Sequence, residues 1–233
     1  MIGKKHKDKL VKVKLISFSA PTKEYADQGI DDAQELIAYC ARVSNPSNQL
    51  NTETSEKLIS YLVKHAHWSP LEMVSACMEI ETTRDIARQI LRHRSFSFQE
   101  FSQRYANPDE QFDDMFVKRE ARLQDEKNRQ NSIETDDIEI QREWYRIQGR
   151  VQWMAEREYR NAIKLGIAKE QARALLPEGL TKSRLYMNGT LRSWIHFIEL
   201  RSGNGTQKEH MKIAQTCAHV ISDVFPMATK LLK

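Results

Sequence analysis

The sequence predicts one domain of the α+β or α/β type in which helices dominate. The chain has 233 residues, enough for a single substantial core. At least five stretches repeat apolar residues at helical intervals, whereas only two or three alternate apolar with polar residues as strands do. With 40% hydrophobic and 29% charged residues, the composition is typical of globular proteins and excludes the disordered and fibrous classes.

The N-terminal third switches between the two patterns. A strand is expected at 12–20, where apolar and polar residues alternate until Pro21. Helical spacing follows at 31–45 and at 53–65. The period then returns to two at 72–82, which predicts a second strand. Its buried face should hold Val74, Ala76, Met78 and Ile80.

The middle of the chain combines a long helix with the weakest pattern. A helix is expected at 82–94, with Thr82 or Thr83 as its cap. Polar residues prevail at 106–142 without a sustained apolar period, so we expect a long loop or a loosely helical insertion there. A long helix should follow at 143–166, whose last residue is a glycine suited to a helix end.

The C-terminal third should be mostly helical. A short helix fits 169–177, which ends at a proline, and two amphipathic helices fit 191–201 and 206–225. After the short helix and before the first amphipathic helix, the stretch 183–190 predicts a short strand or a turn.

Some classes of protein are excluded by what the sequence lacks. No run approaches the about 18 apolar residues of a membrane span, and the lysine-rich start lacks the apolar stretch of a signal peptide. We therefore expect a cytoplasmic protein without a membrane partner.

Cys40, Cys77 and Cys217 lie far apart in apolar surroundings, which predicts buried thiols. No metal site is expected, because the spacing of His65 and His67 disfavours a shared ion.

One short segment, 92–105, collects residues that neither an ordinary core nor an ordinary surface needs. It holds three arginines, a histidine, a glutamate, three serines and four aromatic rings. Arginine grips phosphate oxygens with a rigid fork of donors, and serine hydroxyls can complete such a cage. We therefore expect an anion site formed by Arg92, Arg94, Ser102 and Arg104.

Two further features of this segment favour a ligand over a salt-bridged surface hairpin, the plainer interpretation. Glu100 should relieve repulsion among the guanidiniums, and it could accept a hydrogen bond from a sugar hydroxyl or a base. Aromatic residues should anchor the backbone or stack on a ring. They are Phe96, Phe98, Phe101 and Tyr105.

The order of these residues closely resembles the signature of the flavin-dependent thymidylate synthases. That signature is Arg-His-Arg, seven intervening residues and a serine, with a glutamate two positions before the serine and Arg-Tyr shortly after it. Upstream support comes from "YLVKHAHWSPLE" and "ARQILRHR". Downstream support comes from "ARALLP", "MNGTLRSWIHFIELR" and the Gln-x-Glu of 207–209. The similarity runs from about residue 10 to 225 and is weakest across 106–142.

The resemblance implies reductive methylation of dUMP to dTMP. The one-carbon unit would come from 5,10-methylenetetrahydrofolate, and the hydride from FAD that NADPH has reduced. The resemblance also implies an α+β fold with a small, mostly antiparallel sheet, in one domain over 1–233 that assembles as a homotetramer with active sites between subunits. The other thymidylate synthase class uses a cysteine in a Pro-Cys-His setting, which none of the three cysteines here has. Activation of the uracil would therefore be electrostatic.

Matching this family's pattern residue by residue assigns roles to individual positions. Arg201 would be the catalytic residue, favouring ionisation on the N3 side of the uracil because an arginine stays protonated. The other dUMP contacts would be Gln89, Arg92, Glu100, Ser102, Gln103, Arg104 and Arg173. The FAD contacts would be His67, Ser69, Arg92, His93, Arg94, Glu100, Asn188 and His196.

Several of these assignments have plainer alternatives. Arg201 could be an ordinary arginine at the C-terminus of a helix. Gln89 and Arg173 could be surface residues, Ser69 could cap a helix, and His196 could be a core histidine.

The chain also departs from the family's pattern. Gln99 stands in place of the usual asparagine, and Ser95-Phe96 stands in place of a pair of small residues. The stretch 188–192 is about two residues longer than the pattern, with the extra residues at 189–190. These changes bear on how the chain reaches the flavin.

Two other classes of protein compete with this interpretation. A nucleic-acid-binding module would grip phosphates with the same arginines and the N-terminal lysines, and would stack a base on Phe98 or Tyr105. The 32 acidic residues and the net charge of only +4 disfavour that module, so no nucleic-acid partner is expected. A helical scaffold without chemistry would leave the cluster of arginine, serine and glutamate unexplained.

Overall fold

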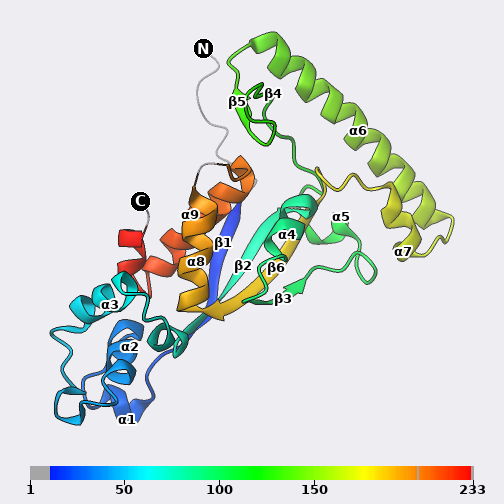
Figure 1. Cartoon of the computed structure of the whole chain (residues 1–233). Coiled ribbons are helices and arrows are strands. Elements are labelled where there is room, and N and C mark those ends of the chain that lie inside the picture. The colour runs from blue at the N-terminus through cyan, green and yellow to red at the C-terminus, as the bar shows by residue number, and fades with distance from the viewer. Residues whose placement is uncertain (1–10, 204, 232–233) are drawn as a thin grey trace, which may run out of the picture.

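A four-stranded antiparallel sheet forms the centre of the computed structural model, which describes residues 11–203 and 205–231 (Figure 1). The strands are β1 (Lys12–Phe18), β2 (Ser75–Thr83), β3 (Ser97–Glu100) and β6 (Lys182–Thr190). Their spatial order is β1-β2-β6-β3, and every neighbouring pair is antiparallel. The expected helix-rich α+β fold with a small antiparallel sheet is confirmed.

Helices make up most of the remaining chain. They are α1 (Lys23–Ala26), α2 (Ala33–Ala41), α3 (Ser55–Lys64), α4 (Arg84–Ile90), α5 (Pro108–Gln111), α6 (Ile138–Lys164), α7 (Lys169–Ala172), α8 (Leu191–Ser202) and α9 (Lys208–Ser222). Short 3-10 helices occupy Pro46–Asn48, Ser69–Glu72, Arg173–Leu175 and Pro226–Leu231. A small hairpin of β4 (Arg122–Gln124) and β5 (Ser132–Glu134) precedes α6. None of the helices in the described part of the chain combines the length and apolar character that crossing a bilayer requires.

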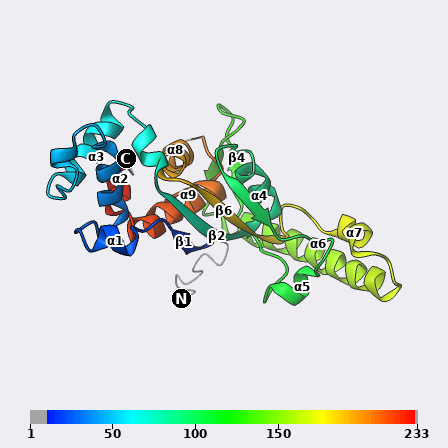
Figure 2. The same cartoon turned by 90° about the horizontal axis from the view of Figure 1, so that it is seen from below.

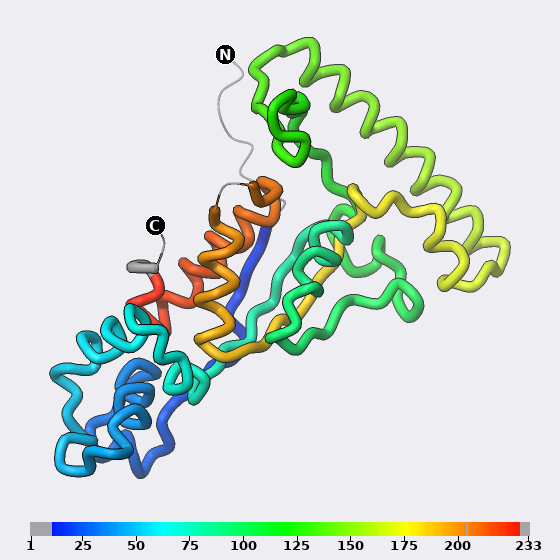
Figure 3. Tube along the Cα trace, viewed as in Figure 1, coloured from blue at the N-terminus to red at the C-terminus, as the bar shows by residue number. Residues whose placement is uncertain are grey.

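The core lies between the sheet and helices α8 and α9, which run side by side, with α9 next to β1 (Figure 3). The alternation expected in the second strand is confirmed, because Ala76, Met78 and Ile80 are at most 1% exposed. Trp194 of α8 is fully buried against them, and its indole Nε1 donates to the carbonyl of Ala76 at 3.0 Å. Burial of each large apolar side chain contributes about 1.5–3 kcal/mol, so this layer holds the sheet and both helices together.

The polar face of the sheet is stabilised by pairs across its two central strands. Arg184 Nε donates to Glu81 at 3.1 Å, and the Tyr186 hydroxyl donates to Glu79 at 2.9 Å. These polar residues alternate with buried ones along β6. These polar residues explain why the sequence predicts only a short strand or a turn at 183–190. The structure has a nine-residue strand there, which is one of the two central strands.

The stretch 106–142 contains more regular structure than its composition indicates. It holds α5, the β4–β5 hairpin and the start of α6, which begins at Ile138 and not at 143. The earlier start has a local cause. The carboxylate of Asp137 accepts hydrogen bonds from the backbone N–H groups of Glu139 and Ile140 at 2.9 and 3.1 Å, which caps the helix. At the other end, Gly166 has the positive φ of +80° that suits the residue after a helix.

Helix α6 extends away from the sheet at one end of the molecule, whereas α2 and α3 lie at the other end (Figures 1 and 2). Of its large residues, Tyr159 is buried, and its hydroxyl donates to Asn107 at 3.1 Å. Others are between 38% and 59% exposed: Trp144, Tyr145, Val151, Trp153 and Met154. Most of the apolar surface of α6 is therefore not covered by the described part of the chain.

Candidate active site

Arg201 and His93 meet although 108 positions separate them in the sequence. Arg201 lies in the last turn of α8, and its Nε donates to Nε2 of His93 at 2.9 Å. His93 must accept this bond through an unprotonated nitrogen. Burial, and then the charge of Arg201, lower the pKa of His93 to about 4, so the ring is neutral at pH 7. Arg201 is therefore held by a specific partner and is not an ordinary helix-end arginine.

His210, near the start of α9, continues this cluster inward. It is fully buried, and its ring centroid lies 6.1 Å from that of His93. Its Nδ1 lies 3.3 Å from Oε1 of Gln89, whereas its Nε2 has no hydrogen-bond partner within the described residues. Burial, Arg201 and His93 together lower the pKa of His210 to about 3. Both imidazoles thus stay neutral beside a permanent positive charge.

A chain of hydrogen bonds leads from Gln89 to the β4–β5 hairpin. Gln89 Nε2 donates to Gln207 Oε1 at 2.8 Å, and Gln207 Nε2 donates to Glu209 Oε2 at 3.0 Å. The other oxygen of Glu209 pairs with Arg122 of β4, and these two side chains are only 5% and 12% exposed. Burial alone would raise the pKa of Glu209, but the hydrogen bond and charge of Arg122 lower it below its usual value.

Two arginines of the signature point into solvent and not toward the cluster around Arg201. Arg92 and Arg94 are exposed, and across residues 11–203 and 205–231 neither side chain forms a hydrogen bond or an ion pair. The helix expected at 82–94 is shorter than predicted, because α4 ends at Ile90. The turn that follows directs His93 inward and leaves Arg92 in solvent. The segment thus offers two unpaired guanidiniums to an anion.

The partner of Glu100 differs from the expected one. Ser183 Oγ donates to Glu100 at 2.8 Å, and Arg84 of α4 lies 3.7 Å from the same oxygen. The expectation that Glu100 relieves repulsion among the signature arginines is therefore wrong. β3 pairs with β6 at this point, and this pairing brings Glu100 to Ser183. No local pattern in the sequence indicates it.

A hollow of about 390 Å³ lies beside the signature. Gln103 in its wall is 2% exposed, and its Nε2 has no partner among the described residues. Arg173 also lines the hollow and is partly buried, so neither it nor Gln89 is a plain surface residue. Arg104 is joined to the lining through Glu170, at 3.5 Å. The polar lining consists of Arg84, Arg88, Gln103, Glu170, Arg173 and Glu178.

The residues assigned to flavin by resemblance divide into two groups. His196 is exposed, and its ring packs edge-on against Trp68 at 4.4 Å between centroids, so it is not a core histidine. Ser69 follows Trp68 as the first residue of a 3-10 helix and forms no capping bond, so it is not a cap. His67 immediately precedes them. Asn188 is exposed on β6 and pairs with Ser97 of β3, three residues after Arg94.

Two departures from the family pattern meet in space. A Cβ atom added to Gly189 would lie 2.4 Å from the ring of Phe96, closer than atoms can approach. Phe96 packs edge-on against Trp194 at 4.8 Å, so its ring cannot easily move. Phe98 also packs against the core, whereas Tyr105 is 79% exposed and anchors nothing. Phe96 thus fills the space that Gly189 leaves, which couples the two changes.

The cysteines do not provide a nucleophile. Cys217 is buried, as expected, but Cys40 and Cys77 are only partly buried. Burial raises the pKa of all three thiols, so they remain protonated at neutral pH.

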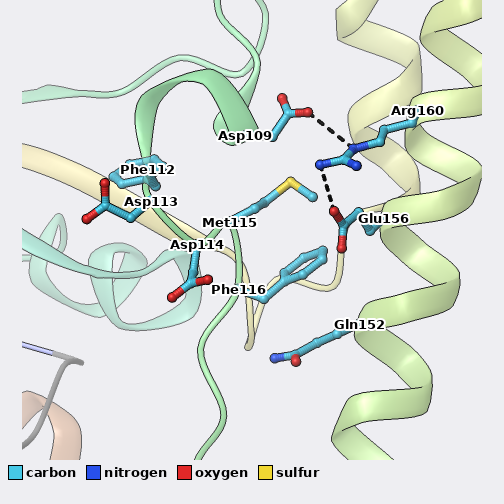
Figure 4. Close-up of a pocket in the computed structure, with 9 residues that line it drawn as sticks. All are labelled: Asp109, Phe112, Asp113, Asp114, Met115, Phe116, Gln152, Glu156 and Arg160. Carbon is cyan, nitrogen blue, oxygen red and sulfur yellow. Dashed lines mark ion pairs between the residues drawn. The ribbon is translucent and has the colours of Figure 1, made fainter.

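A second hollow, of about 220 Å³, has the opposite charge (Figure 4). It lies between α6 and the segment that follows α5. Arg160 spans it, 3.5 Å from Asp109 and 2.7 Å from Glu156. Asp113 and Asp114 add further negative charge. None of the residues assigned to a ligand from the sequence lies in its wall.

Comparison with known proteins decides which family this arrangement belongs to. Residues 27–227 match the family model Thy1, described as thymidylate synthase complementing protein. A probable flavin-dependent thymidylate synthase of Paramecium bursaria Chlorella virus 1 is 47% identical over 219 residues, which are 94% of this chain and 97% of the viral protein. The chain belongs to the flavin-dependent thymidylate synthase family.

Other relatives agree with this assignment. The flavin-dependent thymidylate synthase of Synechocystis sp. is 47% identical over 198 residues, which are 85% of this chain and 88% of that protein. The fold resembles the crystal structure of the UMP/dUMP methylase PolB from Streptomyces cacaoi, with a TM-score of 0.75 and 24% identity over 95% of this chain and 93% of that one. Membership of the flavin-dependent thymidylate synthase family, and with it a flavin-dependent methyl-transferring enzyme, is confirmed as the sequence predicts.

Several residues of the cluster receive no role from the sequence. They are Arg84, Arg122, Gln207, Glu209 and His210. The Gln-x-Glu spacing marks two of them, but nothing in the helical pattern of α9 distinguishes His210 from its apolar neighbours. Arg122 lies in the stretch without a pattern, so only the fold reveals its partner.

Proposed function

We propose that this chain converts dUMP to dTMP, with 5,10-methylenetetrahydrofolate as one-carbon donor and NADPH-reduced FAD as hydride donor. The observation that carries the proposal is the guanidinium of Arg201, partly buried and bonded to a neutral histidine in a cluster that contains no thiol. Membership of the flavin-dependent thymidylate synthase family supports it.

Arg201 is the proposed catalytic residue. Its positive charge stabilises negative charge that develops on the uracil ring as C5 becomes nucleophilic. The bond to His93 fixes one edge of the guanidinium and leaves its terminal nitrogens for the nucleotide. Because His93 stays neutral, its hydrogen bond leaves the positive charge of Arg201 uncompensated and available to the uracil.

The hollow beside the signature is the proposed phosphate end of the dUMP site. Gln103 offers a buried amide without a partner, and Arg173 offers a guanidinium in the same wall. Ser102 and Arg104 lie at its edge, and Glu100 is held nearby by Ser183. Arginine and amide donors of this kind suit phosphate oxygens.

The residues proposed for FAD fit an anionic group with an aromatic ring. Arg92 and Arg94 have no partner among the described residues and suit the pyrophosphate, and the exposed His196 with the half-buried Trp68 offers a surface to a ring. His67, Ser69, His93, Glu100 and Asn188 complete the proposed set. When bound, FAD supplies the hydride for methylation.

The assembly and location of the enzyme belong to the same proposal. We propose one domain over 1–233, with 106–142 as an insertion, in a cytoplasmic homotetramer whose active sites lie between subunits. The exposed apolar residues of α6 support an interface, because a 27-residue helix with so much uncovered apolar surface is costly in water. No metal, nucleic-acid or membrane partner is proposed.

Two measurements test this function. The purified protein should be yellow, NADPH should bleach the flavin, and turnover of dUMP with methylenetetrahydrofolate should require FAD. Arg201→Lys should lower kcat about 100- to 1,000-fold while flavin stays bound, since lysine keeps the charge but not the planar fork. A colourless protein that binds oligonucleotides with a steep salt dependence would favour the nucleic-acid alternative, and normal turnover in the variant would remove Arg201 from its role.

A further inference from the structure

The side-chain amide of Gln89 is held at both of its ends. Its nitrogen donates to Gln207 at 2.8 Å, and its oxygen lies 3.3 Å from Nδ1 of His210. An amide carries a donor at one end and an acceptor at the other, so a rotation by about 180° exchanges them. Which end faces which partner decides what Gln89 can offer to a ligand.

The carboxylate of Glu209 sets the donor and acceptor of every hydrogen bond in the series from Glu209 to His210. Glu209 is ionised beside Arg122, and a carboxylate can only accept hydrogen bonds. Gln207 must therefore turn its nitrogen toward Glu209 and its oxygen toward Gln89. Gln89 must then turn its own nitrogen toward Gln207. Its oxygen faces His210, which has to carry its proton on Nδ1.

We propose that this chain of bonds locks the amide of Gln89 in one orientation and that the locked amide lets the enzyme accept uracil and reject cytosine. His210 and Gln207 are positioning residues in this account. The proposal rests on the proposed function, in which Gln89 contacts dUMP.

The chemistry of the two bases carries the discrimination. Uracil presents an acceptor oxygen at position 4 and a donor at N3, whereas cytosine presents a donor amino group at position 4 and an acceptor at N3. After its bonds to Gln207 and His210, Gln89 keeps one free N–H and one free lone pair. An amide free to rotate could pair with either base. A locked amide can pair with only one, and the wrong base leaves buried polar groups unpaired.

The test compares two substitutions of one histidine. His210→Asn places an amide nitrogen close to the position of Nδ1 and keeps the donor, whereas His210→Leu removes it. His219→Leu is the matched control, because His219 lies on the same helix and is exposed. The dissociation constant of dUMP and the inhibition constant of dCMP against dUMP turnover are measured on the FAD-loaded full-length protein, together with its flavin spectrum and thermal unfolding.

In His210→Leu, dUMP should bind about tenfold more weakly, while dCMP should inhibit measurably better than in the wild type. His210→Asn and the control should keep the wild-type preference within about twofold. The proposal would be overturned if His210→Leu lost affinity for dUMP and dCMP equally. It would also be overturned if dCMP, at 100 times the dissociation constant of dUMP, inhibited the variant no better than the wild type. If the leucine variant does not fold, Glu209→Gln with Arg122→Met applies the same criteria, because a glutamine at 209 no longer fixes the direction of the chain. A wild-type protein that does not bind dUMP would instead refute the proposed function.

Discussion

In the Arg-His-Arg signature, the histidine is partly buried and hydrogen-bonded, whereas the two arginines are exposed to solvent. His93 turns inward to a cluster in which Arg201, His210, Gln89 and their neighbours satisfy one another almost completely. Arg92 and Arg94, one position to either side, remain exposed and unpaired within the described residues. The difference teaches that the described chain itself organises one half of the signature and leaves the other half open to solvent.

The largest effect should come from breaking the buried end of the organised half. Arg122→Ala should lower the free energy of unfolding by about 3 kcal/mol, because it leaves the carboxylate of Glu209 buried without its partner. Arg94→Ala removes an exposed arginine with no partner, so it should change that free energy by less than about 0.5 kcal/mol and weaken FAD binding instead.

Chemical denaturation and flavin titration of both variants check this contrast. Similar stability losses in the two proteins, or unchanged FAD affinity in Arg94→Ala, would contradict the division of the signature into two halves.

A smaller effect should appear where the organised half rests on the sheet. Gly189→Ala should destabilise the protein by about 2 kcal/mol, because the new methyl group would meet the ring of Phe96 at 2.4 Å. Phe96→Leu should recover part of this loss in the double variant, since the two positions are in contact. Thermal unfolding of the two single variants and the double variant gives the coupling energy. Strict additivity would show that the ring moves aside freely.

The smallest effect concerns protons. The pKa values of His93 and His210 are lowered to about 4 and about 3, below the usual value of about 6.5. As the pH falls below about 6.5, the unfolded chain therefore takes up protons before the folded chain does, and stability decreases until His93 is protonated at about pH 4 and His210 at about pH 3. His210→Leu should reduce the difference in unfolding free energy between pH 7 and about pH 5.5 by about 1 kcal/mol, with His219→Leu as the control. An unchanged pH dependence in His210→Leu would mean that the histidine is not kept neutral by the fold.

Sequence patterns predicted most of the scaffold but less of the site. Period and burial agree in β2 and α3, because one face of each element packs on the core and the other does not. The same logic undervalued β6, whose outward face carries Arg184 and Tyr186 and so reads as turn-like, although it is the central strand.

Within the site, the family's pattern predicts which residues take part, but only the structure shows which side chains contact each other. Arg201 and His93 both stand in the family's pattern, but only the fold brings the turn after α4 against α8 and the two side chains to 2.9 Å. The sequence matches Glu100 to the wrong arginines, because its partner Arg84, at the start of α4, comes within 3.7 Å of it only in the fold. Long-range pairs of this kind leave no periodic trace in the sequence, so His210 and Arg122 could not be found from it.

The place of β6 also has a consequence for how the chain matures. β3 joins the sheet only through β6, which lies more than 80 residues further along the chain. A chain growing on the ribosome must therefore carry β2 and β3 with open hydrogen-bonding edges until β6 has been synthesised. Such edges invite pairing with other chains. A chain truncated before residue 182 lacks β6 and should be prone to aggregation, whereas a chain whose β6 has emerged from the ribosome should not be.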